Sequence, residues 1–352
     1  MSSDELKWGV LGCGNIVNDF LLAMERGKRK HKVVAIGAST LERSQAFVQE
    51  RNYSARAYGS YLEVLLDEEV EVVYVGLRNA DHFYYTMKAL DKGKHVLCEK
   101  PLGVNAKQTK QMIQKANSKR LFLMEAFWSR FLPAYQQIRH TIDTNELGRP
   151  RLVHAALGYS LPPDFVNLDR GETMLTTLGC YTVMLSSFVF GAEKPQRISY
   201  TGEKNSKGGD SWTSIRLNYG ENRDAVLLLD ERHFLPNDAF IGFEQGCIKI
   251  EGNFWAPTEL KITTNGGKTE TKTFPLNDDR AFNYTNSSAL KYEADHVYDC
   301  IKSGKIESDM MPLTETRVIQ EIVDDLRNQM KISFPQDRLF VQDLMRTMSL
   351  TK

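Results

Sequence analysis

A charged pair directly follows an apolar stretch in HVLCEKP, residues 95–101. The apolar run predicts a buried strand that stops at Glu99, Lys100 and Pro101. Strands of a parallel sheet end at the crevice where ligands bind. An ammonium group there can polarise a carbonyl group or stabilise an alkoxide. We therefore predict that Lys100 is a catalytic amine. The alternative is an ordinary exposed charge at a strand end.

A glycine-rich turn, VLGCGNIV at residues 10–17, indicates phosphate binding. Gly12 and Gly14 lie where an apolar run gives way to a helical pattern, so the backbone can turn tightly and approach a pyrophosphate. Val17 takes the third position of G-x-G-x-x-G, which leaves the motif incomplete. The alternative is a tight strand-to-helix connection. Together with Lys100, the turn predicts a dinucleotide held opposite a catalytic amine.

The residues after the second predicted strand bear on the choice of cofactor. NAD-binding proteins usually carry an acid there that bonds the ribose hydroxyls. This chain has Ser39 at that place, followed by Thr40 and Arg43. Small hydroxyls and a nearby guanidinium suit a 2′-phosphate, so NADP is favoured and NAD stays possible. The alternative is that Arg43 is a solvated helix charge.

The amino-terminal part alternates short β-branched runs with amphipathic stretches, which is typical of β-α-β units. This pattern predicts an α/β Rossmann domain with a doubly wound parallel sheet, residues 1–124. The predicted strands are 8–12, 32–39, 70–77, 95–99 and 120–125, and the predicted helices are 16–26, 41–51, 60–66, 82–92 and 105–118.

The pattern changes near residue 125, where strand runs follow one another without helices between them. Such runs predict an antiparallel or mixed sheet, and hence an α+β domain for substrate binding and oligomerisation, residues 125–352. Hairpin turns are expected at 207–210 and 265–268. The predicted strands are 151–159, 211–220, 224–230, 239–244, 246–252 and 258–264, and the predicted helices are 131–142, 173–190, 287–303 and 313–331.

The composition favours a small-molecule partner. The 45 basic and 45 acidic residues cancel, so neither nucleic acid nor an anionic membrane has electrostatic support. No apolar run is long enough to span a bilayer, and no signal peptide is recognisable. The five cysteines are scattered, which argues against disulfides and zinc and favours a cytoplasmic location. The seven histidines show no metal spacing, so we expect no metal.

Several ordered motifs resemble the glucose-fructose oxidoreductase/inositol dehydrogenase/MocA (GFO/IDH/MocA) family, and within it the branch of dimeric dihydrodiol dehydrogenases and NADP-linked xylose dehydrogenases. The resemblance implies a Rossmann domain, then a large, mostly antiparallel sheet whose outer face commonly forms the interface of a homodimer or higher homo-oligomer. It also implies a sugar, polyol or related hydroxy or carbonyl substrate at the domain junction. The motifs include GCGNIV, AYGSY (57–61), GKHVLCEKPLGVN (93–105), MEAFWSRFLPAY (124–135) and YEADHV (292–297).

The resemblance also implies which residues contact the cofactor. They lie in the glycine turn, in the segment after the strand that ends at Gly76, in the Glu-Lys-Pro turn and in the FWSRF motif. These residues are Gly12, Gly14, Asn15, Ile16, Leu77, Asn79, His82, Glu99, Lys100, Trp128 and Arg130.

The family's second catalytic motif is D-x-G-x-H or D-x-G-x-Y, and this chain offers TLGCY, residues 177–181. Tyr181 then holds the acid/base position, where a neighbouring ammonium such as Lys100 would favour the phenolate and lower its pKa. Thr177 replaces the aspartate and offers only a neutral hydroxyl, so its catalytic role is doubtful. The alternatives are a core aromatic for Tyr181 and ordinary helix packing for Thr177.

Four aromatic residues are predicted to line the substrate pocket, because a dry lining suits hydride transfer. They are Trp128, Tyr159, Trp255 and Phe282, and the alternative is that any of them is a core residue. The preferred function is an NADP-dependent oxidoreductase. The alternative, which Thr177 motivates, is a dinucleotide-binding sensor or regulator with weak or no catalysis.

Overall fold

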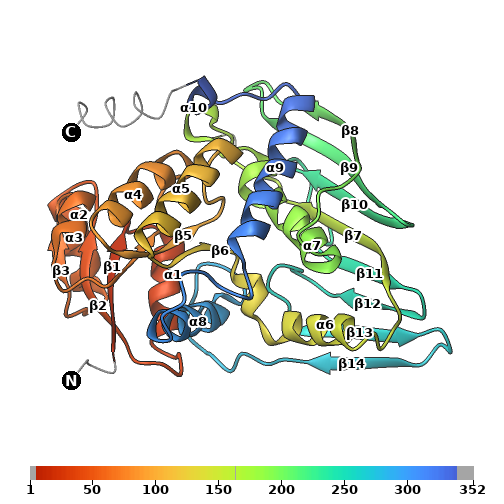
Figure 1. Cartoon of the computed structure of the whole chain (residues 1–352), viewed down its shortest axis with the longest axis horizontal. Coiled ribbons are helices and arrows are strands. Elements are labelled where there is room, and N and C mark those ends of the chain that lie inside the picture. Colours follow the sequence, from red (N-terminus) through yellow and green to blue (C-terminus); the bar gives the residue numbers. More distant parts are fainter. Residues whose placement is uncertain (1–4, 163, 339–352) are drawn as a thin grey trace. The chain divides into compact units, whose positions relative to one another are not determined.

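The computed structural model describes residues 5–162 and 164–338, which form two compact units (Figure 1). The first unit contains the described residues up to Trp128 and then Asp278–Leu313. The second unit contains Ser129–Asn277 and Thr314–Arg338. This division differs from the single boundary predicted at residue 124, because helix α8 (Leu290–Lys302) packs against α1 (Asn15–Met24). The ends of the two predicted domains, residues 1–4 and 339–352, lie outside the described residues.

The first unit is built on a parallel sheet of six described strands in the order β3-β2-β1-β4-β5-β6. This is the doubly wound order, and the Rossmann prediction is confirmed. Only the three-residue strand β3 was not predicted, because it has no apolar run. The strands are β1 (Leu6–Leu11), β2 (His31–Gly37), β3 (Arg56–Tyr58), β4 (Val72–Val75), β5 (His95–Glu99) and β6 (Leu123–Ala126).

The helices of this unit begin where short polar residues cap them. Thr40, Ser60 and Asn105 each accept a hydrogen bond from the backbone amide three residues later, which satisfies a free donor of the first turn. Besides α1 and α8, the helices are α2 (Leu41–Glu50), α3 (Tyr61–Leu66), α4 (Asn79–Asp91) and α5 (Ala106–Lys119), with a short 3-10 turn at Ser287–Ala289.

The second unit contains an eight-stranded sheet in the described residues, in the order β14-β13-β12-β11-β7-β10-β9-β8. Every neighbouring pair is antiparallel except β7 and β10, so the prediction of a large, mostly antiparallel sheet is confirmed. The strands are β7 (Pro150–Gly158), β8 (Arg197–Lys204), β9 (Asp210–Gly220), β10 (Arg223–Asp230), β11 (Ala239–Phe243), β12 (Gly246–Ile250), β13 (Glu259–Thr264) and β14 (Thr269–Thr273).

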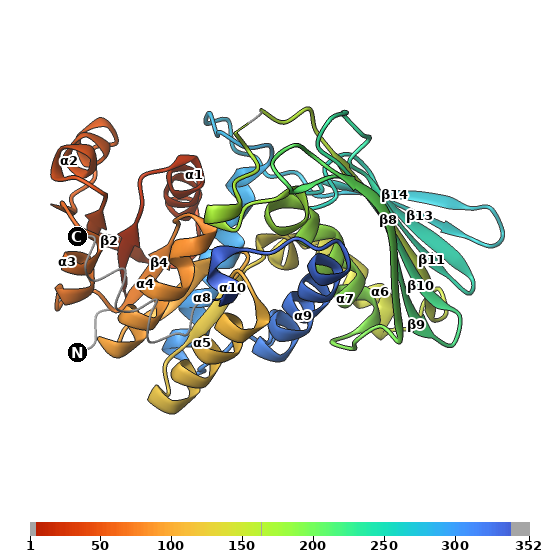
Figure 2. The ribbon, with the colours of Figure 1, turned by 90° about the horizontal axis from the view of Figure 1, so that it is seen from above.

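Helices cover one face of this sheet. Figure 2 shows α6 (Pro133–Asp143), α7 (Cys180–Phe190) and α9 (Leu313–Gln329) on the same side of the strands. All of α7 is buried, and it packs against β7 and β10. Along β9 to β11 buried residues alternate with partly exposed ones, as expected for a sheet with one covered face. The unit also has the short helix α10 (Pro335–Arg338) and 3-10 turns at Leu168–Arg170 and, starting at the boundary, Trp128–Phe131.

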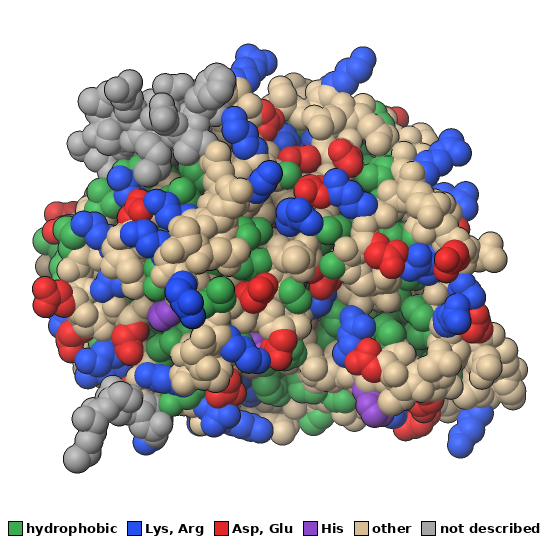
Figure 3. Space-filling model, viewed as in Figure 1, with side chains coloured by type: hydrophobic (Ala, Val, Ile, Leu, Met, Phe, Trp, Pro, Cys, Tyr) green, Lys and Arg blue, Asp and Glu red, His purple; other side chains and the backbone are tan. Residues whose placement is uncertain are grey.

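The surface carries charges of both signs. Lys and Arg side chains are interspersed with Asp and Glu on the face drawn in Figure 3. Among the helices that the structure describes, none combines the length and apolar character needed to cross a membrane.

Candidate active site

The glycine loop between β1 and α1 leaves room for a phosphate. Gly12 has a φ of +109°, and a Cβ atom there would lie 2.4 Å from the carbonyl oxygen of Gly76, so only glycine fits. A Cβ atom on Gly14 would meet nothing within 4 Å, because the backbone faces open space. Gly14 and Asn15 are exposed at the start of α1. A loop of this shape fits the diphosphate of a dinucleotide.

Val17 stands at the third position of the glycine motif, and Gly76 provides the space that it needs. The third glycine normally allows the helix to pack closely on the sheet. Here a Cβ atom on Gly76, just after β4, would come within 2.5 Å of the Val17 side chain. Gly76 therefore takes over the role of the missing third glycine. Helix α1 still packs closely on the sheet although Val17 occupies the third position of the motif.

The residues predicted to determine the preference for NADP over NAD follow β2. Ser39, Thr40 and Arg43 are all exposed, and Thr40 caps α2. Burial raises the pKa of the Cys13 thiol in the glycine loop to about 11, and the positive charges of Arg43 and Arg51 oppose this shift. The Arg43 charge therefore acts on the glycine loop.

Buried side chains hold the Glu-Lys-Pro turn in place by hydrogen bonds. The Tyr74 hydroxyl donates to Glu99 at 2.7 Å, and Glu125 accepts the backbone amide of Leu102 at 2.8 Å. Burial raises the pKa of the Glu99 carboxyl, which the Lys100 ammonium opposes. The Glu99 side chain, predicted to contact the cofactor, is thus buried in the core, while Lys100 is partly exposed. The Lys100–Pro101 peptide is cis.

His82 joins two loops that were predicted to contact the cofactor. Its Nδ1 lies 2.8 Å from the carbonyl oxygen of Pro101, and its Nε2 lies 3.1 Å from that of Leu77. Burial lowers the pKa of His82 to about 4 although both carbonyls oppose this shift. A neutral ring has one N–H, so it donates to one of these two carbonyl oxygens at a time. His82 and the first residue of α4, Asn79, are both buried, so His82 positions the loops from inside.

Arg130 lies in a buried ion pair instead of on an open surface. Its guanidinium donates to both carboxylate oxygens of Glu315 at 2.5 and 2.9 Å and packs on Phe188 at 4.6 Å. These contacts give Arg130 a structural place within the second unit. Trp128, the last residue of the first unit, is also buried. No local pattern indicates the Glu315 contact, because 185 positions separate the partners.

Thr177 lies in a π-helical turn, Leu175–Gly179, that leads into α7. The buried carboxyl of Asp210 accepts the backbone amide of Leu175 at 2.8 Å and so anchors the turn. Burial raises the pKa of Asp210 to about 6. Single π-helical turns are frequent at functional sites. The predicted helix 173–190 is therefore interrupted, with Thr177 inside the turn and Tyr181 just beyond it.

Four aromatic side chains of the second unit form a cluster, here called the aromatic wall. The ring centroids of Tyr159 and Trp255 are 6.1 Å apart, those of Tyr181 and Trp255 6.3 Å, and those of Tyr159 and Phe234 5.5 Å. Tyr159, Phe234 and Trp255 follow β7, β10 and β12, three strands that run in the same direction and end at one edge of the sheet.

The wall unites most of the predicted substrate residues of this unit and adds one. Tyr181 is 5% exposed, whereas Phe234, which the sequence analysis missed, is 73% exposed. Phe234 could have been identified from the sequence, because it is an apolar residue in the polar loop that follows an apolar strand. The other two predicted substrate residues, Trp128 and Phe282, belong to the first unit, where Phe282 lies beside the Arg280 guanidinium.

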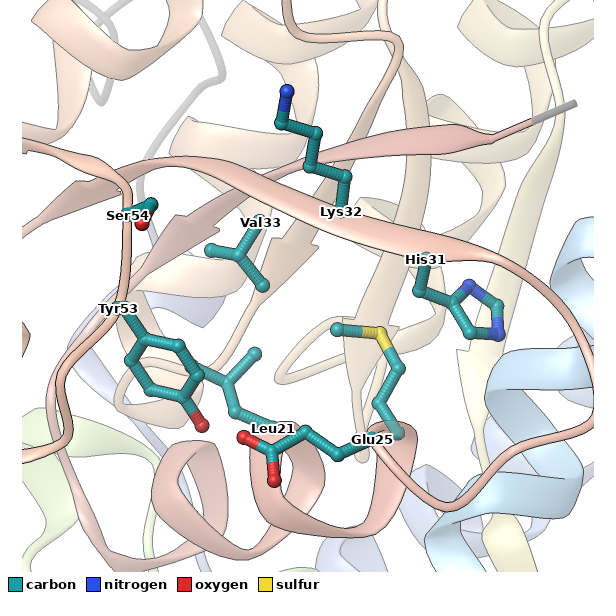
Figure 4. Close-up of a pocket in the computed structure, with 8 residues that line it drawn as sticks. Leu21, Glu25, His31, Lys32, Val33, Tyr53 and Ser54 are labelled. Carbon is teal, nitrogen blue, oxygen red and sulfur yellow. The ribbon is translucent and has the colours of Figure 1, made fainter. Parts of the chain in front are cut away.

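A pocket of about 250 Å³ lies elsewhere in the first unit (Figure 4). Leu21 contributes from α1, Glu25 from just after this helix, and Lys32 from the amino-terminal part of β2. Tyr53 turns its hydroxyl towards Glu25. The glycine loop follows the carboxyl end of β1, the opposite edge of this parallel sheet. None of the predicted site residues lines this pocket, so it is separate from the candidate site.

One group of possible metal ligands occurs in the described residues. The ligand atoms of His296, Cys300 and Asp309 lie within 4.8 Å of one another. Two of these three residues already contact other polar groups. The Ser308 hydroxyl lies 2.7 Å from His296 Nε2, and the Lys305 ammonium lies 3.0 Å from Asp309. We therefore assign no metal to this group.

Comparisons with known proteins show the family and agree with the fold. Residues 6–127 match the family model described as an oxidoreductase family with an NAD-binding Rossmann fold, and residues 135–234 match the GFO/IDH/MocA C-terminal domain. The chain is 37% identical to the trans-1,2-dihydrobenzene-1,2-diol dehydrogenase of Mus musculus over 95% of this chain and 99% of that protein. It is 35% identical to the Homo sapiens enzyme of the same name, with the same coverage.

Solved structures show the same fold at lower identity. An aldose-aldose oxidoreductase from Caulobacter crescentus, complexed with glycerol, has a TM-score of 0.79 at 17% identity, covering 93% of this chain and 98% of that chain. A 3-ketoreductase from Actinomadura kijaniata, in complex with NADP and TDP-benzene, has a TM-score of 0.76 at 22% identity, covering 92% and 97%.

Proposed function

Because this chain belongs to the GFO/IDH/MocA oxidoreductase family and is an NAD(P)-dependent oxidoreductase, we propose that it acts on a sugar, a polyol or a related hydroxy or carbonyl compound. A cyclic trans-diol, such as the one in the name of its relatives, falls in this class. The observation that carries the proposal is the Tyr181 phenol, which follows the π-helical turn and belongs to the aromatic wall.

Tyr181 and Lys100 carry the proposed chemistry. In the oxidative direction Tyr181, as phenolate, takes the proton of the substrate hydroxyl, and the Lys100 ammonium stabilises the alkoxide that forms. In the reductive direction Tyr181 returns the proton. The nicotinamide, when bound, supplies the hydride acceptor or donor at its C4 carbon. Thr177 provides a neutral hydroxyl one helical turn before Tyr181, and we retain it as a candidate substrate contact.

Several residues are proposed to hold the cofactor. The open backbone at Gly14 supports binding of the diphosphate beside Asn15 and Ile16. Ser39, Thr40 and Arg43 support NADP over NAD, because they place two hydroxyls and a guanidinium where a 2′-phosphate needs donors. Tyr159, Phe234 and Trp255 are proposed to exclude water from the substrate. Trp128, which is buried, and Phe282, which is partly exposed, remain predicted contacts of cofactor or substrate.

A homo-oligomer is proposed through the open face of the large sheet. Leu152, Val226, Leu228 and Phe240 project to the face opposite the buried residues, and the register places them on adjacent strands. Leu152 is 36% exposed. His154 lies between Val226 and Phe240 in the register, so the apolar side chains alternate with polar ones. Apolar side chains on an uncovered sheet face support contact with a second copy. A cytoplasmic location is also proposed, which the five free cysteines of the described residues support.

A substrate screen tests the function. Aldoses, polyols and trans-1,2-dihydrobenzene-1,2-diol are each assayed with NADP⁺ and NAD⁺, using wild type, Lys100→Met and Tyr181→Phe. Each variant should lose about 10²- to 10⁴-fold in kcat and still bind NADP⁺. Lys110→Met, an exposed lysine on α5, is the matched control and should keep full activity. Unchanged turnover in either variant contradicts its role, and NADP(H) binding without turnover of any compound favours a sensor.

A further inference from the structure

The residues from Asp278 to Asn286, here called the return segment, carry the chain back into the first unit after β14. They form neither a helix nor a strand. Two of them nevertheless hydrogen-bond to α1, the helix that begins at the glycine loop, and a third bonds to Glu25, the residue just after this helix. We therefore asked what function these hydrogen bonds between an irregular segment and the glycine-loop helix could serve.

Asp19 on α1 is the main attachment point. Its side chain is fully buried. Oδ1 accepts the backbone amide of Asn283 at 3.0 Å and the side-chain amide of Asn283 at 2.6 Å, and Oδ2 accepts the backbone amide of Tyr284 at 2.9 Å. A buried carboxylate is costly unless donors surround it. The arrangement therefore fixes the backbone of both residues relative to α1.

Two further contacts extend the attachment along the helix. Arg280 donates to Glu25, the residue that follows α1, at 3.0 Å, and Asp278 holds the same guanidinium at 2.8 Å. At the other end, the Asn283 side chain reaches the carbonyl oxygen of Asn15 at 3.4 Å. The return segment thus follows α1 from its last turn to its first.

Tyr284 is held at the end that faces the glycine loop. Its ring is 50% exposed although its backbone is fixed by Asp19. Its hydroxyl is within hydrogen-bonding reach of the Asn15 side chain. Burial, then the charges of Asp19 and Glu99, raise the pKa of Tyr284, while Arg78 opposes them. Asn15 and Arg78 follow β1 and β4, and Glu99 is the last residue of β5. The carboxyl ends of these strands form the edge where such sheets bind dinucleotides.

We propose that the return segment is a clamp for the dinucleotide, in which Tyr284 contacts the bound cofactor and Asp19 is the positioning residue that holds the clamp in place. The exposed ring supplies an apolar and aromatic contact, and the hydroxyl supplies a donor beside the open backbone of Gly14. Phe282, a predicted substrate contact, lies on the same segment. The inference rests on the proposed function, since it concerns the same cofactor.

Binding measurements test the clamp without relying on turnover. The dissociation constants of NADP⁺ and NADPH are determined by calorimetry for wild type, Tyr284→Ala and Tyr284→Phe. Tyr284→Ala should bind about tenfold more weakly and Tyr284→Phe about threefold. The matched control is Tyr292→Ala, a partly exposed tyrosine on α8 of the same unit, which should bind as wild type does.

The outcomes separate the two proposals. If wild type binds neither dinucleotide, the proposed function fails. If wild type binds and Tyr284→Ala binds equally well, the clamp is overturned and the proposed function stands. If Tyr292→Ala weakens binding as much as Tyr284→Ala does, the effect is not specific to the return segment and the clamp is likewise overturned.

Asp19→Asn tests the positioning role. In wild type, NADP⁺ should slow hydrogen exchange at the backbone amides of Asn283 and Tyr284, which Asp19 accepts. In the variant these amides should exchange faster, and the KM for NADP⁺ should rise about tenfold while kcat changes less than about twofold. Equal exchange with and without NADP⁺ in wild type, or a loss confined to kcat, contradicts the proposal. Because Tyr284→Ala alters an exposed side chain, the proposal stays testable even if Asp19→Asn does not fold.

Discussion

Single buried side chains do much of the positioning in this protein. His82 holds the Leu77 loop and the Pro101 turn together, and Asp210 anchors the turn that contains Thr177. The resemblance marked His82 as a cofactor contact and did not mark Asp210. The positioning contacts of both residues, with Pro101 and Leu175, join positions 19 and 35 residues apart. Arg43 differs, because its position after β2 already indicated a role at the cofactor.

His82 should make the first unit sensitive to acid. Its pKa is about 4 in the folded chain and about 6.5 when unfolded, so between these values the unfolded chain binds the additional proton. The stability that His82 contributes is complete above about pH 6.5 and is lost as the pH falls towards 4. The loss between pH 7 and pH 5 should be roughly 2 kcal/mol.

Urea unfolding at both pH values checks this expectation. His82→Gln, which cannot titrate, should show a smaller decrease in unfolding free energy than wild type. The exposed His140→Gln should behave as wild type does. Equal decreases in wild type and His82→Gln would contradict a lowered pKa.

Arg43→Gln should change the cofactor preference. If the guanidinium binds a 2′-phosphate, its loss should weaken NADP⁺ binding by about 10- to 100-fold and leave NAD⁺ binding within about twofold. Calorimetry with both nucleotides measures this. Lys32→Gln, an exposed charge at the amino end of β2, is the control. Tighter binding of NAD⁺ than NADP⁺ by wild type would refute the argument from Ser39 and Arg43.

At the scale of elements, close contact between α1 and β4 compensates for the missing third glycine. A methyl group on Gly76 would lie 2.5 Å from Val17, so Gly76→Ala should destabilise the fold by about 1–3 kcal/mol and weaken dinucleotide binding. Adding Val17→Ala should recover at least half of that loss, because the clash is removed. Thermal unfolding of both single variants and the double variant tests this, and strictly additive effects would argue against direct packing.

The elements that the sequence analysis missed are short or lie at edges. Strands β3, β8 and β14 each lie at the end of their sheet order, where one side lacks a partner strand. Their residues are mostly exposed or partly exposed, so no apolar alternation marks them. The central strands were predicted nearly to their ends, because burial demands apolar residues there.

At the scale of the whole molecule, the open face of the large sheet should decide the oligomeric state. Val226→Glu places a charge in the apolar row of β10 and should convert a homodimer into monomers, because an unpaired charge is costly in an interface. Sedimentation velocity measures the change. His140→Glu, on the exposed side of α6, should leave the assembly intact. A wild-type monomer, or a variant that stays assembled, would contradict the proposed interface.

Local patterns in the sequence determined the parallel Rossmann sheet, the glycine loop, the Glu-Lys-Pro turn and the family, because alternation, helix caps and turn residues act within a few positions. Only the tertiary structure decided that the four residues of the aromatic wall form one cluster, that Arg130 pairs with Glu315, and that the return segment binds α1 through Asp19. These contacts join residues that are tens to hundreds of positions apart. They depend on strand order and on where the chain returns, which no local pattern specifies.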